Sequence, residues 1–220
     1  MRPRAKSAAF AGRLLLLVVP LMVGLGCGEK LELITSDFSE NFERAAVGST
    51  WRDSGGGYRV VSGELVAGHV PHHPLWLKKQ LPRDLSMEFD ARTMSPDGDI
   101  RVVVFGDGKS ANPGGDGCQS TGYELVFGGW KNHLSVLCRG GQIDRGHQRA
   151  RTDWPVVPGR TYHMYITRKD GVIAWYVNGD EMASWTDPEP LMGPGHEAFG
   201  FDGGDTEVFF DNLVVGPYHL

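Results

Sequence analysis

The sequence TYHMYITRKDGVIAWYVNGDEMASW, residues 161–185, decides the fold class. Apolar and polar residues alternate along it, and two turn sequences interrupt it, Lys169-Asp170-Gly171 and Asn178-Gly179. Asn-Gly favours a type I′ turn, because both central residues of that turn need a positive φ. The pattern therefore predicts three consecutive antiparallel strands joined by tight turns.

Other parts of the chain show the same kind of pattern. Residues 58–68 (YRVVSGELVAG) indicate two short strands around Ser62-Gly63, and residues 85–93 (LSMEFDART) alternate strictly. Residues 122–141 (GYELVFGGWKNHLSVLCRGG) indicate a hairpin that bends at GGWKN. Further strands are expected within 99–108, 196–204 and 206–216. Residues 110–120 and 150–158 are expected to form rim loops, where ligand contacts could lie.

About a dozen short strands at this spacing predict an all-β chain. The chain also has 31 glycines and 13 prolines, and it shows no amphipathic stretch of helical period that is long enough to be a main element. We therefore expect a two-sheet antiparallel β-sandwich, or jelly roll. An up-and-down barrel is the alternative.

The first 27 residues predict an export signal. The apolar run 14–25 is shorter than the roughly 20 residues of a transmembrane helix, and it follows four basic residues: Arg2, Arg4, Lys6 and Arg13. The run ends in VGLGC at Cys27, which resembles the lipobox of bacterial lipoproteins, where the cysteine is lipidated and becomes the new N-terminus. We expect a signal at 1–27, a tether at 28–36 and one domain at 37–220. The expected location is the bacterial cell envelope, at the outer membrane, with plain secretion or the periplasm as the alternative.

The charge of the chain restricts its partners. The formal net charge is −5, and loss of the basic leader makes the remainder more acidic. A nucleic-acid partner is not expected, because binding to a phosphate backbone depends on clustered Lys and Arg. We expect a monomer that meets the membrane only through its lipid anchor. If Cys27 is acylated, Cys118 and Cys138 remain as a disulfide pair, and two free thiols are the alternative.

Four segments resemble a known superfamily. They are FERAAVGSTWRDSGGGYRVVSGELVAG (42–68), LSMEFDAR (85–92), RTYHMYITRKDGVIAWYVNGDEMASW (160–185) and VFFDNLVV (208–215). Their order resembles the concanavalin A-like lectin/glucanase superfamily, the laminin-G-type jelly roll, over about 38–217. Within it the chain is similar to bacterial exported domains of the 3-keto-disaccharide hydrolase type and to their uncharacterised lipoprotein relatives. This fold hosts lectins, glycosidases, binding modules and adhesive domains, so it does not define a function.

The resemblance implies a test for catalysis. Glucanases of the superfamily place Glu-x-Asp-x-Glu on one strand, so that the carboxylates face one cleft. This chain has Glu88, Asp90 and then Arg92, so the third carboxylate is missing. We therefore assign no catalytic residue and predict non-catalytic binding of a saccharide. The alternatives are a hydrolase of a modified glycoside, with Glu88, Asp90 or loop histidines as acid and base, and an envelope scaffold or adhesive module that binds protein.

Two tryptophans are candidates for an exposed surface on which a sugar ring could stack. Trp130 and Trp154 lie among turn residues, whereas Trp51, Trp76, Trp175 and Trp185 lie in or beside strands and are expected in the core. His133 lies at the hairpin bend, and His147 lies in a polar loop with Asp144 and Arg145. The predicted ligand-binding residues are Trp130, Trp154, His133 and His147.

Two metal sites were considered. His69, His72 and His73 could supply imidazole ligands, but the neighbouring prolines leave the ring directions open, and a hydrogen-bonding loop is the favoured interpretation. In many carbohydrate-binding jelly rolls the first and last strands share a structural calcium. The segments NFER and FFDNL resemble those two places, which implies Glu43 and Asp211 as oxygen ligands. The alternative is that Asp211 satisfies backbone donors in a kink of the strand.

Overall fold

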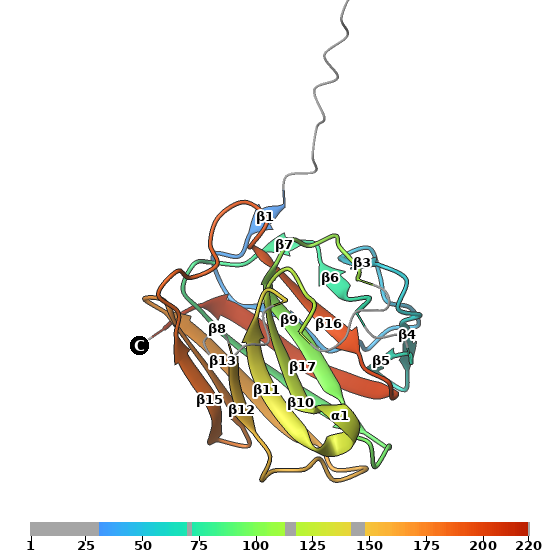
Figure 1. The fold of residues 1–220 in the computed structure, drawn as a ribbon. Coiled ribbons are helices and arrows are strands. Elements are labelled where there is room, and N and C mark those ends of the chain that lie inside the picture. The colour runs from blue at the N-terminus through green and yellow to red at the C-terminus, as the bar shows by residue number, and fades with distance from the viewer. Residues whose placement is uncertain (1–30, 70–71, 113–117, 142–147, 220) are drawn as a thin grey trace, which may run out of the picture. The chain divides into compact units, whose positions relative to one another are not determined.

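A computed structural model describes residues 31–69, 72–112, 118–141 and 148–219, and they form a β-sandwich. Two large antiparallel sheets face each other, as Figure 1 shows. Neither sheet closes on itself, so the prediction of a sandwich is confirmed and the barrel alternative is excluded. Within the described residues no helix has the length and apolarity needed to cross a membrane.

The seven-stranded sheet positions the candidate site. Its spatial order is β12 (Gln148–Arg151), β11 (Leu134–Arg139), β10 (Tyr123–Gly128), β9 (Ile100–Gly106), β16 (Ala198–Gly203), β6 (Leu75–Leu77) and β3 (Trp51–Asp53). Strand β9 therefore lies between β10, which follows it in the sequence, and β16, which comes almost a hundred residues later. Side chains that are distant in the sequence meet on these three strands.

The eight-stranded sheet forms the other layer. Its order is β15 (Asp180–Thr186), β14 (Val172–Val177), β13 (Tyr162–Lys169), β8 (Leu85–Thr93), β17 (Val208–Pro217), β5 (Glu64–Ala67) and β4 (Arg59–Val61), and β2 (Phe38–Glu40) also pairs with β17. A short parallel pair joins β1 (Glu32–Leu33) to β7 (Lys79–Gln80). Strand β1 lies within the stretch 28–36 that we predicted as a tether.

The strands β13, β14 and β15 form the predicted meander. Its turns have positive φ at both central residues, 50° and 81° at Asp170-Gly171 and 51° and 88° at Asn178-Gly179. These are the conformations that a type I′ turn requires. Strand β8 alternates between buried and half-buried residues along its whole length, as its sequence predicts.

Aromatic side chains fill the space between the sheets. The ring of Phe201 lies 4.5 Å from that of Phe210, 4.8 Å from Phe199 and 5.5 Å from Phe89, measured between centroids. Trp51, Trp175 and Trp185 are buried in this core, as predicted. Trp76 is also buried, but it packs with Val103 and Ala198 outside this core, so the predicted core position is wrong for Trp76. Removal of this apolar surface from water is the main force that holds the two layers together.

The hairpin of β10 and β11 bends through the four-residue helical turn α1 (Gly129–Asn132). Trp130, Lys131 and Asn132 all have positive φ there. The side chain of Asn132 holds the bend, since its Nδ2 donates to the carbonyl of Val156 at 2.7 Å and its Oδ1 accepts from the Val156 N–H at 2.7 Å. The bend is thus tied to the loop that precedes β13.

Candidate functional site

Three charged side chains lie on the outer face of the seven-stranded sheet. In β10 the side chains of Tyr123 and Leu125 enter the core, so the alternation of the strand directs Glu124 to the opposite face. The strand register pairs Arg101 of β9 with Asp202 of β16, and Glu124 lies diagonally across from Arg101. All three are buried, with exposed fractions of 1% for Glu124 and Asp202 and 6% for Arg101.

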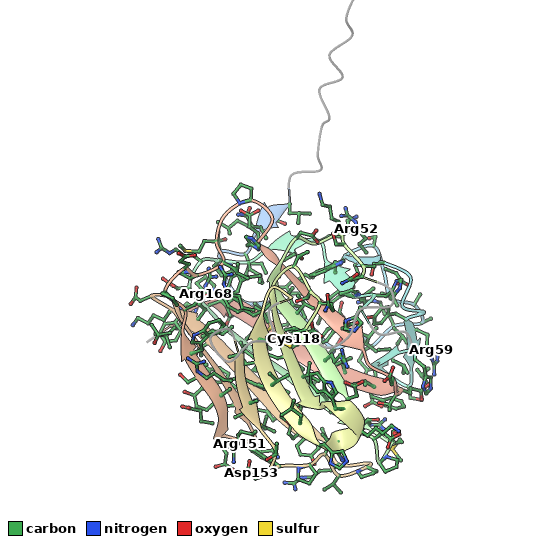
Figure 2. The ribbon with its side chains drawn as sticks, viewed as in Figure 1. Arg52, Arg59, Cys118, Arg151, Asp153 and Arg168 are labelled. Carbon is green, nitrogen blue, oxygen red and sulfur yellow. A yellow bond between two sulfur atoms is a disulfide. The ribbon has the colours of Figure 1, made fainter. Side chains whose placement is uncertain are left out.

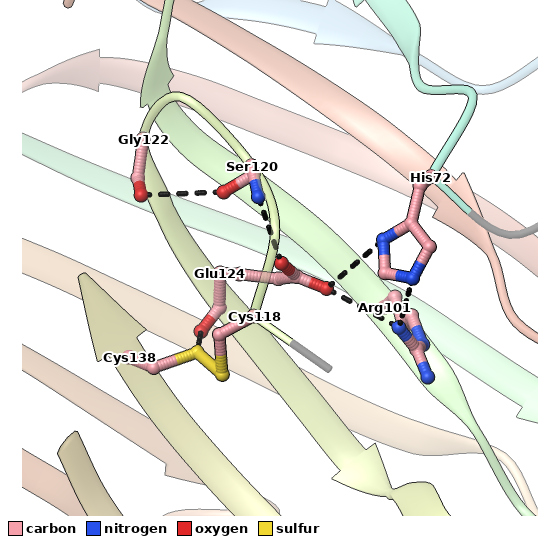
Figure 3. Close-up of a disulfide and its surroundings, with 7 residues drawn as sticks. All are labelled: His72, Arg101, Cys118, Ser120, Gly122, Glu124 and Cys138. Carbon is pink, nitrogen blue, oxygen red and sulfur yellow. Dashed lines mark hydrogen bonds and ion pairs between the residues drawn. A yellow bond between two sulfur atoms is a disulfide. The ribbon is translucent and has the colours of Figure 1, made fainter. Parts of the chain in front are cut away.

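Two more residues complete what we call the charged cluster: His72, Asp99, Arg101, Glu124 and Asp202. Arg101 donates from Nε to Asp99 Oδ1 at 2.6 Å and from Nη1 to Glu124 Oε1 at 3.3 Å. The same Nη1 lies 3.4 Å from His72 Nε2. Figure 3 shows His72, Arg101 and Glu124 pointing toward one another, with the Cys118–Cys138 disulfide beside them.

Backbone donors hold the carboxyl groups of the cluster. The Ser120 N–H donates to Glu124 Oε2 at 3.2 Å, and the His73 N–H donates to Asp202 Oδ1 at 3.2 Å. The Asp205 N–H donates to an oxygen of Asp99 at 2.8 Å. Among the described residues, every buried side-chain nitrogen and oxygen has a hydrogen-bond partner. The cluster is therefore fixed in position by segments that follow or precede three different strands.

Burial shifts the protonation of the two outward carboxyl groups. Burial raises the pKa of Glu124 to about 7, although the Arg101 charge and backbone donors act in the opposite direction. Burial also raises the pKa of Asp202 well above its usual range, and the charge of Glu124 adds to this effect. Both shifts have the same cause. Two carboxyl groups that are buried away from water beside a single guanidinium repel each other when both are ionised, so ionisation of both is unfavourable. Protonated carboxyl groups are thus expected in this cluster near neutral pH.

The raised pKa of Glu124 predicts a pH-dependent stability. Between its ordinary value of 4.5 and about 7, the folded protein holds a proton that the unfolded chain releases. The free energy of unfolding should therefore fall as pH rises through this window, by at most about 1.4 kcal/mol per pH unit for this one group, and level off above it. Chemical denaturation at pH 5, 6, 7 and 8 measures this slope, and Glu124→Gln should reduce it.

A matched control exists on the other sheet. Glu88 is a half-buried glutamate of β8 whose side chain is 45% exposed, so Glu88→Gln should leave the slope unchanged. A slope that is the same in wild type and in Glu124→Gln would show that this carboxyl group is not the source.

A pocket of about 210 Å³ opens over the charged cluster. It is lined by His72, Pro74, Trp76, Ser110, Ala111, Asn112, Gln119, Ser120, Thr121 and Asp202. Trp76 lies over two glycines of the sheet. A Cβ atom added to Gly106 would be 2.5 Å from the indole ring, and one added to Gly200 would be 2.9 Å from it. Side chains at these two positions would displace the indole, so the glycines allow the tryptophan to form a wall of the pocket.

Described parts of the loop between β9 and β10 form the opposite wall. The Ser110 carbonyl accepts a hydrogen bond from Trp76 Nε1 at 3.1 Å, and the Asn112 N–H donates to the His72 carbonyl at 2.8 Å. At the other end of the loop, Cys118 is bonded to Cys138 of β11, as predicted. Figure 2 places Cys118 over the seven-stranded sheet. The rim loop predicted at 110–120 thus contributes to the pocket.

The predicted ligand-binding residues do not line this pocket. Trp130 is 43% exposed at the hairpin bend, and the neighbouring His133 is exposed as well. Trp154 is half-buried, and its ring packs edge-to-face against Phe127 at 5.9 Å, which gives it a place in the core. His147 lies outside the described residues.

Of the two predicted calcium ligands, Asp211 lies on the other sheet and Glu43 lies in the loop between β2 and β3. Asp211 is in β17 at a β-bulge, and its pKa is raised by burial and by the charges of Glu64, Asp90 and Glu43. The Asn212 N–H donates to Asp211 Oδ1 at 2.7 Å, as the alternative of a strand kink also expects. Among the described residues, these carboxylates do not bring three ligand atoms close enough together to hold a metal ion, and the calcium site stays a prediction.

The strand that was compared with glucanases is also remote from the pocket. Glu88 and Asp90 lie on the outer face of the eight-stranded sheet, where Asp90 Oδ1 is 3.1 Å from His163 Nδ1. Arg92 of β8 reaches across β17 and pairs with Glu64 of β5, to which its Nε donates at 3.0 Å.

The three clustered histidines have different partners, as the hydrogen-bonding interpretation expects. His69 Nδ1 lies 3.2 Å from the Asp205 carbonyl, and His73 Nδ1 lies 2.9 Å from the Ser54 carbonyl. Only His72 faces the charged cluster.

His72, Glu124 and Asp202 each offer a ligand atom within 4.8 Å of the others, which is a spacing that a divalent cation could use. The guanidinium of Arg101 contacts the same imidazole and the same glutamate, however. Arg101 presents an N–H donor to Nε2 of His72, which fits an imidazole that carries its proton on Nδ1. In a metal site, the ring nitrogen that does not bind the metal donates its N–H to an acceptor instead. The geometry fits a hydrogen-bonded charge network better than a coordination shell.

Sequence reasoning missed Arg101, Glu124 and Asp202. The only local signal is one charged residue in each of three otherwise apolar runs, IRVVVF, YELVF and FGFDG. A strand that is apolar on both faces is covered on both sides, so a single charge within it must be buried and paired.

Comparisons with known proteins agree on the fold. No protein-family model matches the chain, and no curated protein has a similar sequence. A Bacillus subtilis protein of unknown function with a galectin-like fold has a TM-score of 0.62 at 15% identity, over 83% of this chain and 96% of its own. The Bacillus licheniformis β-glucanase has a TM-score of 0.55 at 14% identity, over 84% and 99%. The carbohydrate-binding module CBM66 from Bacillus subtilis has a TM-score of 0.55 at 12% identity, over 76% and 95%.

These similarities concern the architecture of the chain. The chain has the concanavalin A-like jelly-roll fold, as the resemblance of its sequence predicted. At identities of 12–15% the likeness extends to the fold alone.

Proposed function

We propose that this protein binds a saccharide in the pocket on the outer face of the seven-stranded sheet. One observation supports this most directly. A pocket of about 210 Å³ combines an indole wall with neutral hydrogen-bonding groups in a ring around it. Sugars present apolar C–H faces and many hydroxyls, so they need this combination of an apolar surface and polar partners.

The polar lining is suited to hydroxyl groups. Ser110, Ser120 and Thr121 offer hydroxyls, while Asn112 and Gln119 offer amides that both donate and accept. The fold similarity to a carbohydrate-binding module and to a β-glucanase supports the same class of ligand.

Hydrolysis of a glycoside is the second candidate. A carboxyl group that stays protonated near neutral pH is what a general acid requires, and Asp202 and Glu124 both have raised pKa values. Glycosidases need two carboxyl groups that flank the scissile bond. Of this pair only Asp202 lines the pocket, so binding is the better supported function.

The envelope location is part of the proposal. The signal, Cys27 and the first three residues of the tether, 28–30, lie outside the described residues, so export, lipidation and sorting to the outer membrane rest on the sequence. Mass spectrometry of the mature N-terminus would test them, with diacylglyceryl-modified Cys27 as the expected result.

A variant that fills the pocket tests the function. Ala111 lines the pocket and is half-buried, so Ala111→Trp should occupy the space while keeping the bonds that hold the loop. We expect the wild type to bind at least one oligosaccharide on a glycan array, and the variant to lose at least tenfold in affinity.

Ala150 provides the control. It is exposed on the edge strand β12, so Ala150→Trp adds the same side chain away from the pocket and should bind as the wild type does. Binding that survives Ala111→Trp, or an array without any signal, would contradict the proposed site.

A further inference from the structure

The charged cluster contains more acid than base. Asp99, Glu124 and Asp202 provide three carboxyl groups, and Arg101 provides one guanidinium. Arg101 makes its shortest contact with Asp99, at 2.6 Å, and a second one to the other oxygen of Asp99 at 3.3 Å. This pair is close to neutral as a unit. Glu124 and Asp202 remain, and His72 is the other basic group that faces them.

All members of the cluster are buried, but they differ in their position relative to the pocket. Asp202 and His72 line the pocket, whereas Asp99, Arg101 and Glu124 lie behind them. A bound molecule therefore meets the aspartate and the imidazole, not the guanidinium. The other described lining residues are neutral, so the pocket offers a carboxyl group at its floor and no lysine or arginine among its described walls.

This distribution of charge selects the ligand. A ligand carboxylate would find no lysine or arginine among the described walls, and it would be repelled whenever one of the two buried acids ionises. A ligand ammonium would instead gain a partner at Asp202 and a favourable field from Glu124 behind it. Resting on the proposed saccharide function, we propose that the pocket binds an amino sugar, with the ammonium group paired to Asp202 and the ring against Trp76.

Binding of an ammonium should be coupled to loss of a proton. The groups that face Asp202 are Glu124 from β10, Arg101 from β9, and, before β6, the imidazole of His72 and the backbone N–H groups of His72 and His73. Burial and the Glu124 charge raise the pKa of Asp202, so this carboxyl group keeps its proton to a higher pH than an exposed aspartate does. An ammonium next to the carboxylate favours its charged form, and the proton is released to the buffer.

Calorimetry on the purified protein at pH 7 tests this. The probes are a glucosamine oligosaccharide, its N-acetylated counterpart and an oligogalacturonate of equal length, each titrated in two buffers of different ionisation enthalpy. We expect the glucosamine oligosaccharide to bind at least tenfold more tightly than the other two. Its apparent enthalpy alone should depend on the buffer, because only its binding releases a proton.

Two variants locate the effect. Asp202→Asn should lower the affinity for the glucosamine oligosaccharide at least tenfold and change that for the N-acetylated one by less than about threefold. Asp205 is an exposed acid three residues away, so Asp205→Asn is the matched control and should bind as the wild type does. If Asp202→Asn does not melt cooperatively above 25 °C, the three-ligand comparison on the wild type decides alone.

Several results would overturn the inference. Equal or tighter binding of the N-acetylated or acidic oligosaccharide would do so, as would glucosamine binding that is unaffected in a folded Asp202→Asn. Loss of binding on addition of a chelator would assign the cluster to a metal ion. If neutral saccharides bind and Ala111→Trp abolishes this, the inference alone fails, whereas the absence of binding by any saccharide refutes the proposed function itself.

Discussion

Replacing Arg101 with leucine is expected to lower the free energy of unfolding by about 3–5 kcal/mol at pH 7. The guanidinium is buried and contacts Asp99 at 2.6 Å and Glu124 at 3.3 Å. Leucine has a similar volume, so the loss would come from carboxyl groups that remain in a dry site without their cation. Urea denaturation at pH 7 measures this change. The loss should be smaller at pH 5, where the carboxyl groups are more readily neutralised by protons.

Arg59 offers a control of the same residue type. It pairs with Glu207 on the surface, where an ion pair contributes about 0–1 kcal/mol. Arg59→Leu should therefore cost less than about 1 kcal/mol. If Arg101→Leu costs no more than Arg59→Leu, the buried network does not stabilise the fold in the way described.

Loss of the Cys118–Cys138 disulfide is expected to cost about 3 kcal/mol, because the bond closes a loop with a sequence separation of 20. A second effect should appear in the pocket. Gln119, Ser120 and Thr121 follow the bonded cysteine directly and line the pocket, and the Ser120 N–H holds the carboxylate of Glu124. The double variant Cys118→Ala, Cys138→Ala should therefore lose saccharide affinity as well as stability.

The comparison that tests this uses oxidised and reduced protein. Dithiothreitol should lower the melting temperature and the affinity of the wild type, and it should change neither in the double variant. If the reduced wild type binds as tightly as the oxidised protein, the disulfide is not needed to hold the pocket wall.

Much of the secondary structure could be predicted because it is encoded locally. Strict alternation in LSMEFDART gives β8, and Asp-Gly and Asn-Gly mark the two turns of the meander. The disulfide partners could be predicted from the count of cysteines once Cys27 was assigned to lipidation. The burial of four tryptophans in or beside strands followed from the same patterns.

The candidate site could not be predicted in the same way. Aromatic residues in turns suggested Trp130 and Trp154, yet one is at the hairpin bend and the other packs on Phe127. A turn sequence shows where the chain reverses, but not whether a cavity lies beside it. The histidines of the segment 69–73 were a better guide to the site, because one of them, His72, lines the pocket.

The sequence by itself determined the strands, the turns and the class of the sandwich, because each depends on the pattern of neighbouring residues. Only the tertiary structure brought Arg101, Glu124 and Asp202 together. Strand order places β9 between β10 and β16, and the register then aligns Arg101 with Asp202 and sets Glu124 diagonally beside it. Strand order and register are properties of pairing between distant segments, so the charges that meet in the pocket floor are visible only after the sheet has formed.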